Sequence, residues 1–231
     1  MPGLGTVANV SAIVAGGVMG LAAGGRLPER MREIAFQGVG LVVLVLGVQQ
    51  TLATRNLAFP LVAVVLGGLI GEAVDIEARL EHLGDRLRRL FERTARPESR
   101  FVDGFVSATL IFCVGPLTIL GSISDGLGRG AQLLFIKSAL DGTVAVVLAS
   151  TLGIGVLLSA VSVGVVQGAL TLAASAINAV FTGRMVAETT ATGGILIVAI
   201  GLRLLEIRRL RVGNFLPALV LAPLAVAVFA R

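Results

Sequence analysis

The sequence predicts an all-α protein that crosses a membrane several times. Hydrophobic residues make up 55% of the 231 residues, charged residues only 14%, and the mean hydropathy is +0.95. A soluble domain of this size needs a polar outer layer that this composition does not supply. About 20 apolar residues are enough for one helix to cross the ~30 Å hydrocarbon core of a bilayer. Uncharged runs of suitable length cover 34–54, 56–71, 104–124, 142–183 and 212–230.

About eight transmembrane helices follow from these runs and from the apolar N-terminal stretch. The uncharged run 142–183 has 42 residues. As a single helix it would be roughly 63 Å long, twice the thickness of the bilayer core. We therefore divide it at the glycine-containing stretch 150–155. The predicted spans are 4–24, 34–53, 57–74, 101–120, 131–149, 152–178, 188–205 and 214–230.

The arginines predict the orientation of these helices. Three clusters lie in connections that fall on one side of the membrane: 26–32, 79–100 and 208–211. The opposite connections hold only Arg55, Arg129 and Arg184. Because arginine and lysine accumulate in cytoplasmic loops, we expect both termini to lie outside.

Two segments of the chain indicate an internal repeat. Residues 33–47 and 188–201 both begin with Glu, continue to Gly and six apolar residues, and end in Gly. Each is followed by an Asn and a nearby Pro, at Asn56 to Pro60 and Asn214 to Pro217. The two copies start on opposite sides of the predicted membrane, which is typical of secondary transporters. The alternative is that Gly-rich apolar segments align by chance.

The repeat predicts how the chain is organised. Helices 1–3 form the first repeat in 1–75, and helices 6–8 form an inverted second repeat in 151–231. Helices 4 and 5, with helix 4 broken, occupy 101–150 between them. Residues 76–100 alternate apolar and charged side chains at helical spacing and predict an amphipathic cytoplasmic helix. That helix lies on the membrane surface or pairs with a partner, and both readings are open.

Lys137 is the only lysine among nineteen basic residues, and it stands inside an apolar helix. Asp141 follows four residues later, so both side chains leave the same helix face. A buried ion pair costs far less free energy than an isolated charge at membrane depth. The pair is interpreted either as a gate that responds to a proton or an anionic solute, or as a structural link between helices.

Helix 4 contains Gly115 and Pro116, and the proline removes one backbone hydrogen bond. Irregular backbone at membrane depth is tolerated only inside protein or beside water. The segment therefore predicts a half-helix whose backbone and side chains bind an ion or solute, with a simple proline kink as the alternative. The candidate residues are Pro116, Thr118, Ser122, Ser124 and Asp125.

Helix 6 carries a polar stripe, because Gln167, Thr171 and Asn178 share one face with Ser175 at 100° per residue. Such stripes join helices at least as often as they bind substrate. The start of helix 7 and the connection before helix 8 add the remaining candidates for a substrate or ion pathway: Glu188, Thr189, Thr192 and Asn214.

Other classes of function have little support. The single cysteine, Cys113, excludes an internal disulfide. The single histidine, His82, argues against a zinc or haem site, because such sites need several Cys or His ligands or a His in the core. No catalytic triad, phosphate-binding loop or dinucleotide motif is present. The net charge of +5 comes from arginines in short connections and does not indicate nucleic acid. We expect no enzyme, no cofactor and no metal.

Several motifs together resemble the bacterial inner-membrane family catalogued as domain of unknown function 554. They lie at 66–72, 108–126, 137–142, 149–156, 188–194 and 211–219. The resemblance implies a multi-pass protein of the bacterial inner (plasma) membrane and implies no activity. Asp125, Lys137, Asp141, Glu188, Asn214 and Pro217 occupy motif positions. Residues 128–130 are Gly-Arg-Gly where a Gly-Asp is expected, which weakens any proposal in which a carboxylate side chain at position 129 receives the substrate.

The sequence therefore predicts a secondary transporter of a small solute or ion, with proton or ion coupling as an option. Its partners would be the lipid bilayer, the solute and a second copy in a homodimer. One alternative is a non-transporting structural or regulatory protein that acts through 76–100. The other is an ion channel formed by an oligomer.

Overall fold

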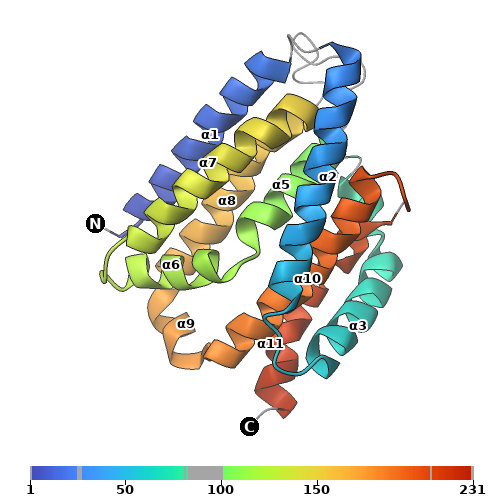
Figure 1. The fold of residues 1–231 in the computed structure, drawn as a ribbon. Coiled ribbons are helices and arrows are strands. Elements are labelled where there is room, and N and C mark those ends of the chain that lie inside the picture. The colour runs from blue at the N-terminus through green and yellow to red at the C-terminus, as the bar shows by residue number, and fades with distance from the viewer. Residues whose placement is uncertain (1, 25–27, 81, 83–100, 209, 230–231) are drawn as a thin grey trace. The chain divides into compact units, whose positions relative to one another are not determined.

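The computed structural model describes residues 2–24, 28–80, 82, 101–208 and 210–229, and every regular element among them is a helix. Figure 1 shows their arrangement. The elements are α1 (Leu4–Gly24), α2 (Glu29–Thr51), α3 (Ala58–Val74), α5 (Phe101–Cys113), α6 (Pro116–Gly126), α7 (Gln132–Leu152), α8 (Ile154–Leu172), α9 (Ala174–Val180), α10 (Gly183–Leu204), the 3-10 turn η1 (Val212–Phe215) and α11 (Ala218–Phe229).

The helices form two compact units, and each unit takes residues from two separate stretches of the chain. The first unit comprises Met1–Phe36 and Leu90–Val180, and so contains α1 and α5 to α9. The second unit comprises Gln37–Arg89 and Phe181–Arg231, and contains most of α2 together with α3, α10, η1 and α11. The four consecutive segments expected from the sequence stay a prediction.

In the first unit, α1 packs along α7 in the same direction with the two backbones in close approach. Gly16 faces the Gly142 carbonyl, and Gly20 faces the Val146 carbonyl one turn later. Small residues permit such an approach, which is a common way for membrane helices to associate. α1 packs antiparallel to α8, with Val10 against Gly164. α5 in turn runs parallel to α8, starting at the same end.

The second unit consists of two antiparallel helix pairs. α2 packs against α10, with Gly40 next to Leu205 and Gly47 next to Val198. α3 packs against α11, with Gly67 next to Ala218 at one end. At the other end Phe59 packs against Val226.

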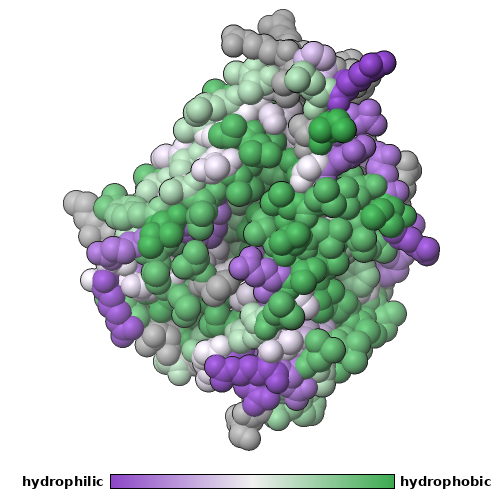
Figure 2. All heavy atoms as spheres, viewed as in Figure 1, coloured by the Kyte–Doolittle hydropathy of each residue, from purple (hydrophilic) through white to green (hydrophobic). Residues whose placement is uncertain are grey.

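The described helices have the length and surface of a polytopic membrane protein, as predicted. Five are long and apolar enough to cross a membrane by length and composition: Leu4–Gly24, Gln132–Leu152, Ile154–Leu172, Gly183–Leu204 and Val212–Phe229. α5 and α6, bent by 60° at their junction, add a sixth if they form one span. Gln37–Thr51 and Ala58–Val74 are shorter apolar helices. Many large hydrophobic side chains are exposed, and they predominate on the face in Figure 2.

Several observed helix boundaries differ from the predicted ones. The division within 142–183 falls at Gly153, whose φ of 82° lies in the left-handed region that glycine adopts without strain. The predicted helix 152–178 is not continuous, because α8 ends at Leu172 and α9 follows. Of the predicted amphipathic helix 76–100, residues 76–80 and 82 are helical, and the rest lies outside the described residues.

The close approach of α1 and α7 predicts a large effect from one added methyl group. A Cβ on Gly16 would collide with the Gly142 carbonyl oxygen, whereas a Cβ on Gly168 in α8 meets nothing within 4 Å. We expect Gly16→Ala to destabilise the detergent-purified protein by about 1–3 kcal/mol. Gly168→Ala should leave the thermal unfolding midpoint unchanged or slightly higher. Equal midpoints for the two variants would contradict this packing.

Candidate functional site

A buried ion pair lies in the first unit, on α7. Lys137 donates a hydrogen bond to Asp141 Oδ2, as their spacing of four residues predicts. Asn9 of α1 donates its Nδ2 hydrogen to the same carboxylate oxygen over 3.0 Å. All three side chains are buried. The ion pair is therefore held between two helices, and its charges neutralise each other.

The ion pair lies deep within the span. Asp141 is nine residues beyond the start of α7, which places it about 14 Å along the helix axis at 1.5 Å per residue. That is close to half the ~30 Å thickness of a bilayer core. Charged groups at such depth are expensive unless they are paired. The pairing thus explains how the two charges are tolerated at this depth.

Several buried polar side chains of the first unit have no hydrogen-bond partner among the described residues. Gln167 of α8 is fully buried, and neither its amide nitrogen nor its amide oxygen is bonded. The hydroxyls of Thr171, Ser122 and Thr6 are likewise unpartnered, as is the amide oxygen of Asn9. Buried polar groups in proteins are nearly always bonded, so this group of exceptions requires an explanation.

These side chains occupy the same end of the first unit. Gly5 of α1 and Gly121 of α6 both pack against Leu134 near the start of α7. Gly126 at the end of α6 packs against the carbonyl of Thr171 near the end of α8. We call the set formed by Thr6, Asn9, Ser122, Lys137, Asp141, Gln167 and Thr171 the polar cluster. It is contributed by four mutually packed helices, α1, α6, α7 and α8.

The break between α5 and α6 leads into a helix that carries part of the polar cluster. Gly115 is extended, with φ 169° and ψ 155°, and α6 begins at Pro116, whose side chain lies outside the described part. The Thr118 hydroxyl donates to the Phe112 carbonyl over 3.0 Å and satisfies one backbone group that the break frees. α6, which follows the break, packs against α7 and α8 and carries Ser122 of the polar cluster. The irregular backbone thus directly precedes a helix that contributes to the cluster.

Asp125 is bonded to the start of α1. Its Oδ2 accepts hydrogen bonds from the backbone amides of Gly3 and Gly5, each over 3.1 Å. A carboxylate at a helix N-terminus bonds amides that have no partner within the helix and interacts favourably with the helix dipole. The Ser124 hydroxyl donates to the Gly130 carbonyl, and so stabilises the turn into α7. Both residues therefore have structural partners.

In the second unit, Glu188 binds the connection between α2 and α3. Its carboxylate is fully buried. It accepts hydrogen bonds from the Thr54 hydroxyl over 2.5 Å and from the Arg55 backbone amide over 2.9 Å. The Thr192 hydroxyl donates to the Glu188 carbonyl on the same helix. The hydroxyl of Thr189 is unpartnered among the described residues.

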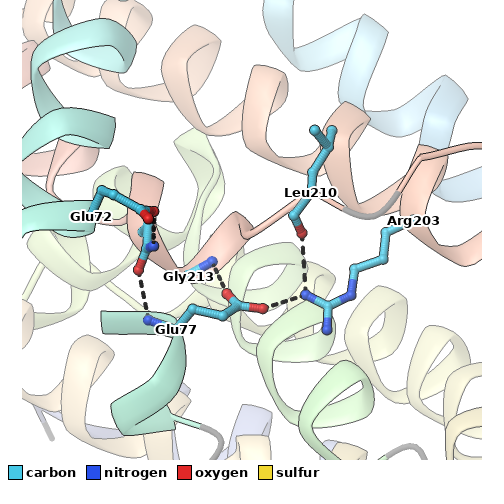
Figure 3. Close-up of polar contacts among 6 residues, drawn as sticks. Glu72, Glu77, Arg203, Leu210 and Gly213 are labelled. Carbon is cyan, nitrogen blue, oxygen red and sulfur yellow. Dashed lines mark hydrogen bonds and ion pairs between the residues drawn. The ribbon is translucent and has the colours of Figure 1, made fainter. Parts of the chain in front are cut away.

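A second carboxylate of this unit, Glu77, joins the end of α3 to the connection between α10 and α11 (Figure 3). One of its oxygens accepts from the Gly213 amide over 2.6 Å and the other from the Arg203 guanidinium over 2.5 Å. Its own amide donates to Asn214 Oδ1 over 2.7 Å, and Asn214 Nδ2 donates to Glu72 over 2.6 Å. Figure 3 shows the Arg203 guanidinium also reaching the Leu210 carbonyl, over 3.3 Å.

The predicted site residues fall into both units. The first unit holds Thr118, Ser122, Ser124, Asp125, Lys137, Asp141, Gln167 and Thr171, together with Pro116 and Asn178, whose side chains lie outside the described part. The second unit holds Glu188, Thr189, Thr192 and Asn214. Sequence reasoning missed Asn9, Thr6 and Glu77. The amphipathic pattern of 76–100 predicted a helix and did not single out Glu77, which is buried.

Comparison with known proteins identifies the family. The family described as "Protein of unknown function (DUF554)" matches residues 4–227. The chain belongs to this family. It is 34% identical to the uncharacterized protein YqgA of Escherichia coli (strain K12) over 227 residues, covering 97% of both chains. It is 29% identical to the uncharacterized membrane protein YdfK of Bacillus subtilis (strain 168) over 228 residues, covering 97% of this chain and 96% of the relative. No solved structure matches the chain.

The contacts of Glu77 predict that its charge is needed for stability. Both carboxylate oxygens accept hydrogen bonds, so a glutamine would place its NH₂ group against a donor. We expect Glu77→Gln to lower the free energy of unfolding by about 2 kcal/mol. Thermal unfolding of the detergent-purified protein measures this. Asp75→Asn is the matched control, because Asp75 is exposed and asparagine tolerates its left-handed backbone. Similar losses in both variants would contradict the assignment.

Proposed function

We propose that this chain is a secondary transporter of the bacterial inner membrane that carries a small solute or ion through the polar cluster. The observation that carries the proposal is the amide of Gln167, which is fully buried in a candidate membrane span with neither atom bonded. Within the hydrocarbon core an unsatisfied polar group costs several kcal/mol. A group that serves only to join helices would have a protein partner, whereas a binding group is free until its ligand or water arrives.

The broken helix supports the same reading. Non-helical backbone at membrane depth is tolerated only where it is buried in protein or lines water. Discontinuous helices next to charged residues are a recurring way to build transporter sites near the midplane. The break at Gly115 directly precedes α6, which packs against α7, the helix that carries Lys137 and Asp141.

Three antiparallel helix pairs support the inverted repeat. α1 packs antiparallel to α8, α2 to α10 and α3 to α11, which is the pairing expected if helices 1–3 and 6–8 are inverted copies. Residues identical at a constant offset of 148 also recur between α1 and the segment 152–168, which the proposed repeat then includes. The identical pairs are Leu4 and Leu152, Gly5 and Gly153, Ser11 and Ser159, Ala12 and Ala160, Gly16 and Gly164, Val18 and Val166, and Gly20 and Gly168.

The proposal includes eight crossings, with both termini outside. α3 has 17 residues and is therefore about 26 Å long, slightly less than the bilayer core. Tilted neighbours and local thinning of the bilayer accommodate differences of this size. The orientation rests on the arginine clusters, which this arrangement collects on the cytoplasmic side.

Lys137→Met tests the transport proposal. Wild-type protein in liposomes should accelerate entry of at least one probe from a panel of erythritol, N-methylurea, glycine, sodium and sulfate. Removing the lysine leaves Asp141 buried without its cation, so we expect flux to fall at least tenfold. Arg129→Met, which removes an exposed cation from the same unit, should retain it. Unchanged flux and pH dependence in Lys137→Met, or no flux of any probe in the wild type, would refute the proposal.

The single thiol provides an independent prediction. Maleimides react with the thiolate, which needs water, so Cys113 should be labelled by a membrane-impermeant maleimide in cells or inverted vesicles if the break is hydrated. Gln167→Leu should slow the labelling at least threefold by making the polar cluster less hydrated. A cysteine at the exposed position Val161, in a Cys113→Ser background, is the control for a lipid-facing thiol and should not react. Absence of Cys113 labelling from either side would argue against a hydrated pathway.

A further inference from the structure

The unpartnered groups of the polar cluster are all uncharged. They are the hydroxyls of Thr6, Ser122 and Thr171, the amide oxygen of Asn9 and both amide atoms of Gln167. The charged groups, in contrast, are already bonded. Lys137 binds Asp141, and Asn9 donates to the same carboxylate. Any ligand that leaves the ion pair intact must therefore be recognised by neutral donors and acceptors.

The charges of the cluster sum to zero, because Lys137 and Asp141 contribute one of each sign. Asp125, a further buried carboxylate of this unit, is bonded to two amides at the start of α1. A ligand with a net charge would remain uncompensated in a medium of low dielectric constant. A ligand that displaces one partner of the ion pair would leave the other buried alone, at a cost of roughly 10²-fold or more in affinity.

The free groups also specify which bonds the ligand makes. The Gln167 amide offers one donor nitrogen and one acceptor oxygen, and each hydroxyl both donates and accepts. A purely apolar ligand would leave all of them unsatisfied. A small molecule that carries donors and acceptors on neighbouring atoms, such as a polyol or a urea-type amide, satisfies them without disturbing the ion pair.

From the zero net charge of the polar cluster and its unpartnered uncharged groups, we infer that its ligand is a small uncharged polar solute. The solute is bound through Gln167, Thr171, Ser122 and Thr6. The inference rests on the proposed transport function and specifies its substrate class. It assigns the ion pair a supporting position: Lys137 and Asp141 keep the site electrically neutral and hydrated, while the uncharged side chains bind the solute. Uptake should then move no net charge across the membrane.

The test compares the two uncharged probes with sodium, sulfate and zwitterionic glycine in proteoliposomes of the full chain. Erythritol or N-methylurea should enter faster than in protein-free liposomes, at a rate unaffected by a potassium diffusion potential. Thr171→Val removes one free hydroxyl and should reduce this rate about five- to tenfold. Thr151→Val is the matched control, because Thr151 is equally buried but its hydroxyl is bonded to carbonyls of its own helix. Its rate should stay within twofold of the wild type.

The other outcomes separate the two proposals. Transport of sodium, sulfate or glycine without the uncharged probes, or uptake that follows the imposed potential, would overturn the inference while leaving a transporter in place. Equal rates in Thr171→Val and Thr151→Val would overturn the assigned binding groups. No flux of any probe would overturn both the inference and the proposed function.

Discussion

A polar group inside a bilayer must find its hydrogen bonds within the protein or from water that the protein encloses, and this constraint accounts for most features of the structure. It makes the described elements helical, because a helix satisfies its own backbone. It pairs Lys137 with Asp141 and brings Asn9 to the same carboxylate. It also places Asp125 over the free amides at the start of α1. Gln167 departs from this constraint. A buried amide without a protein partner is stable only when a ligand or water completes its hydrogen bonds.

The two units use buried carboxylates in different ways. In the second unit, Glu77 and Glu188 bind backbone amides of connections between helices, so their role is to fix where one helix pair joins the next. In the first unit, the carboxylate of Asp141 is shared with a cation, and the groups around it are incompletely bonded. The second unit also has unbonded buried polar atoms, but among the described residues only the first unit combines a buried lysine–carboxylate pair with a fully buried amide that is bonded at neither atom, Gln167. This contrast is why transport is assigned to the first unit.

Local features could be predicted from the sequence, and long-range ones could not. The pairing of Lys137 with Asp141 follows from a helical spacing of four residues, and the end of α7 follows from a glycine. The partner Asn9 lies 132 positions from Asp141, and no pattern within one helix reveals it. The polar stripe of helix 6 was visible, but whether its side chains find partners depends on which helices surround it. Glu77 could not be singled out from the sequence, because amphipathic periodicity describes one helix and carries no information on what packs against it.

The connection between α7 and α8 consists of Gly153 alone. The two helices therefore form a hairpin in which the distance of each residue from the turn follows from its position in the sequence. Residues equally far before and after the glycine lie at nearly the same depth. Lys137 and Asp141 precede it by 16 and 12 positions, and Gln167 follows it by 14, so all lie roughly 20 Å from the turn. One inserted residue on either arm would shift that arm by about 1.5 Å and rotate it by about 100°. The rotation would turn the ion pair or the amide to another face of its helix, so the lengths of both arms are under the same constraint as the polar residues they carry.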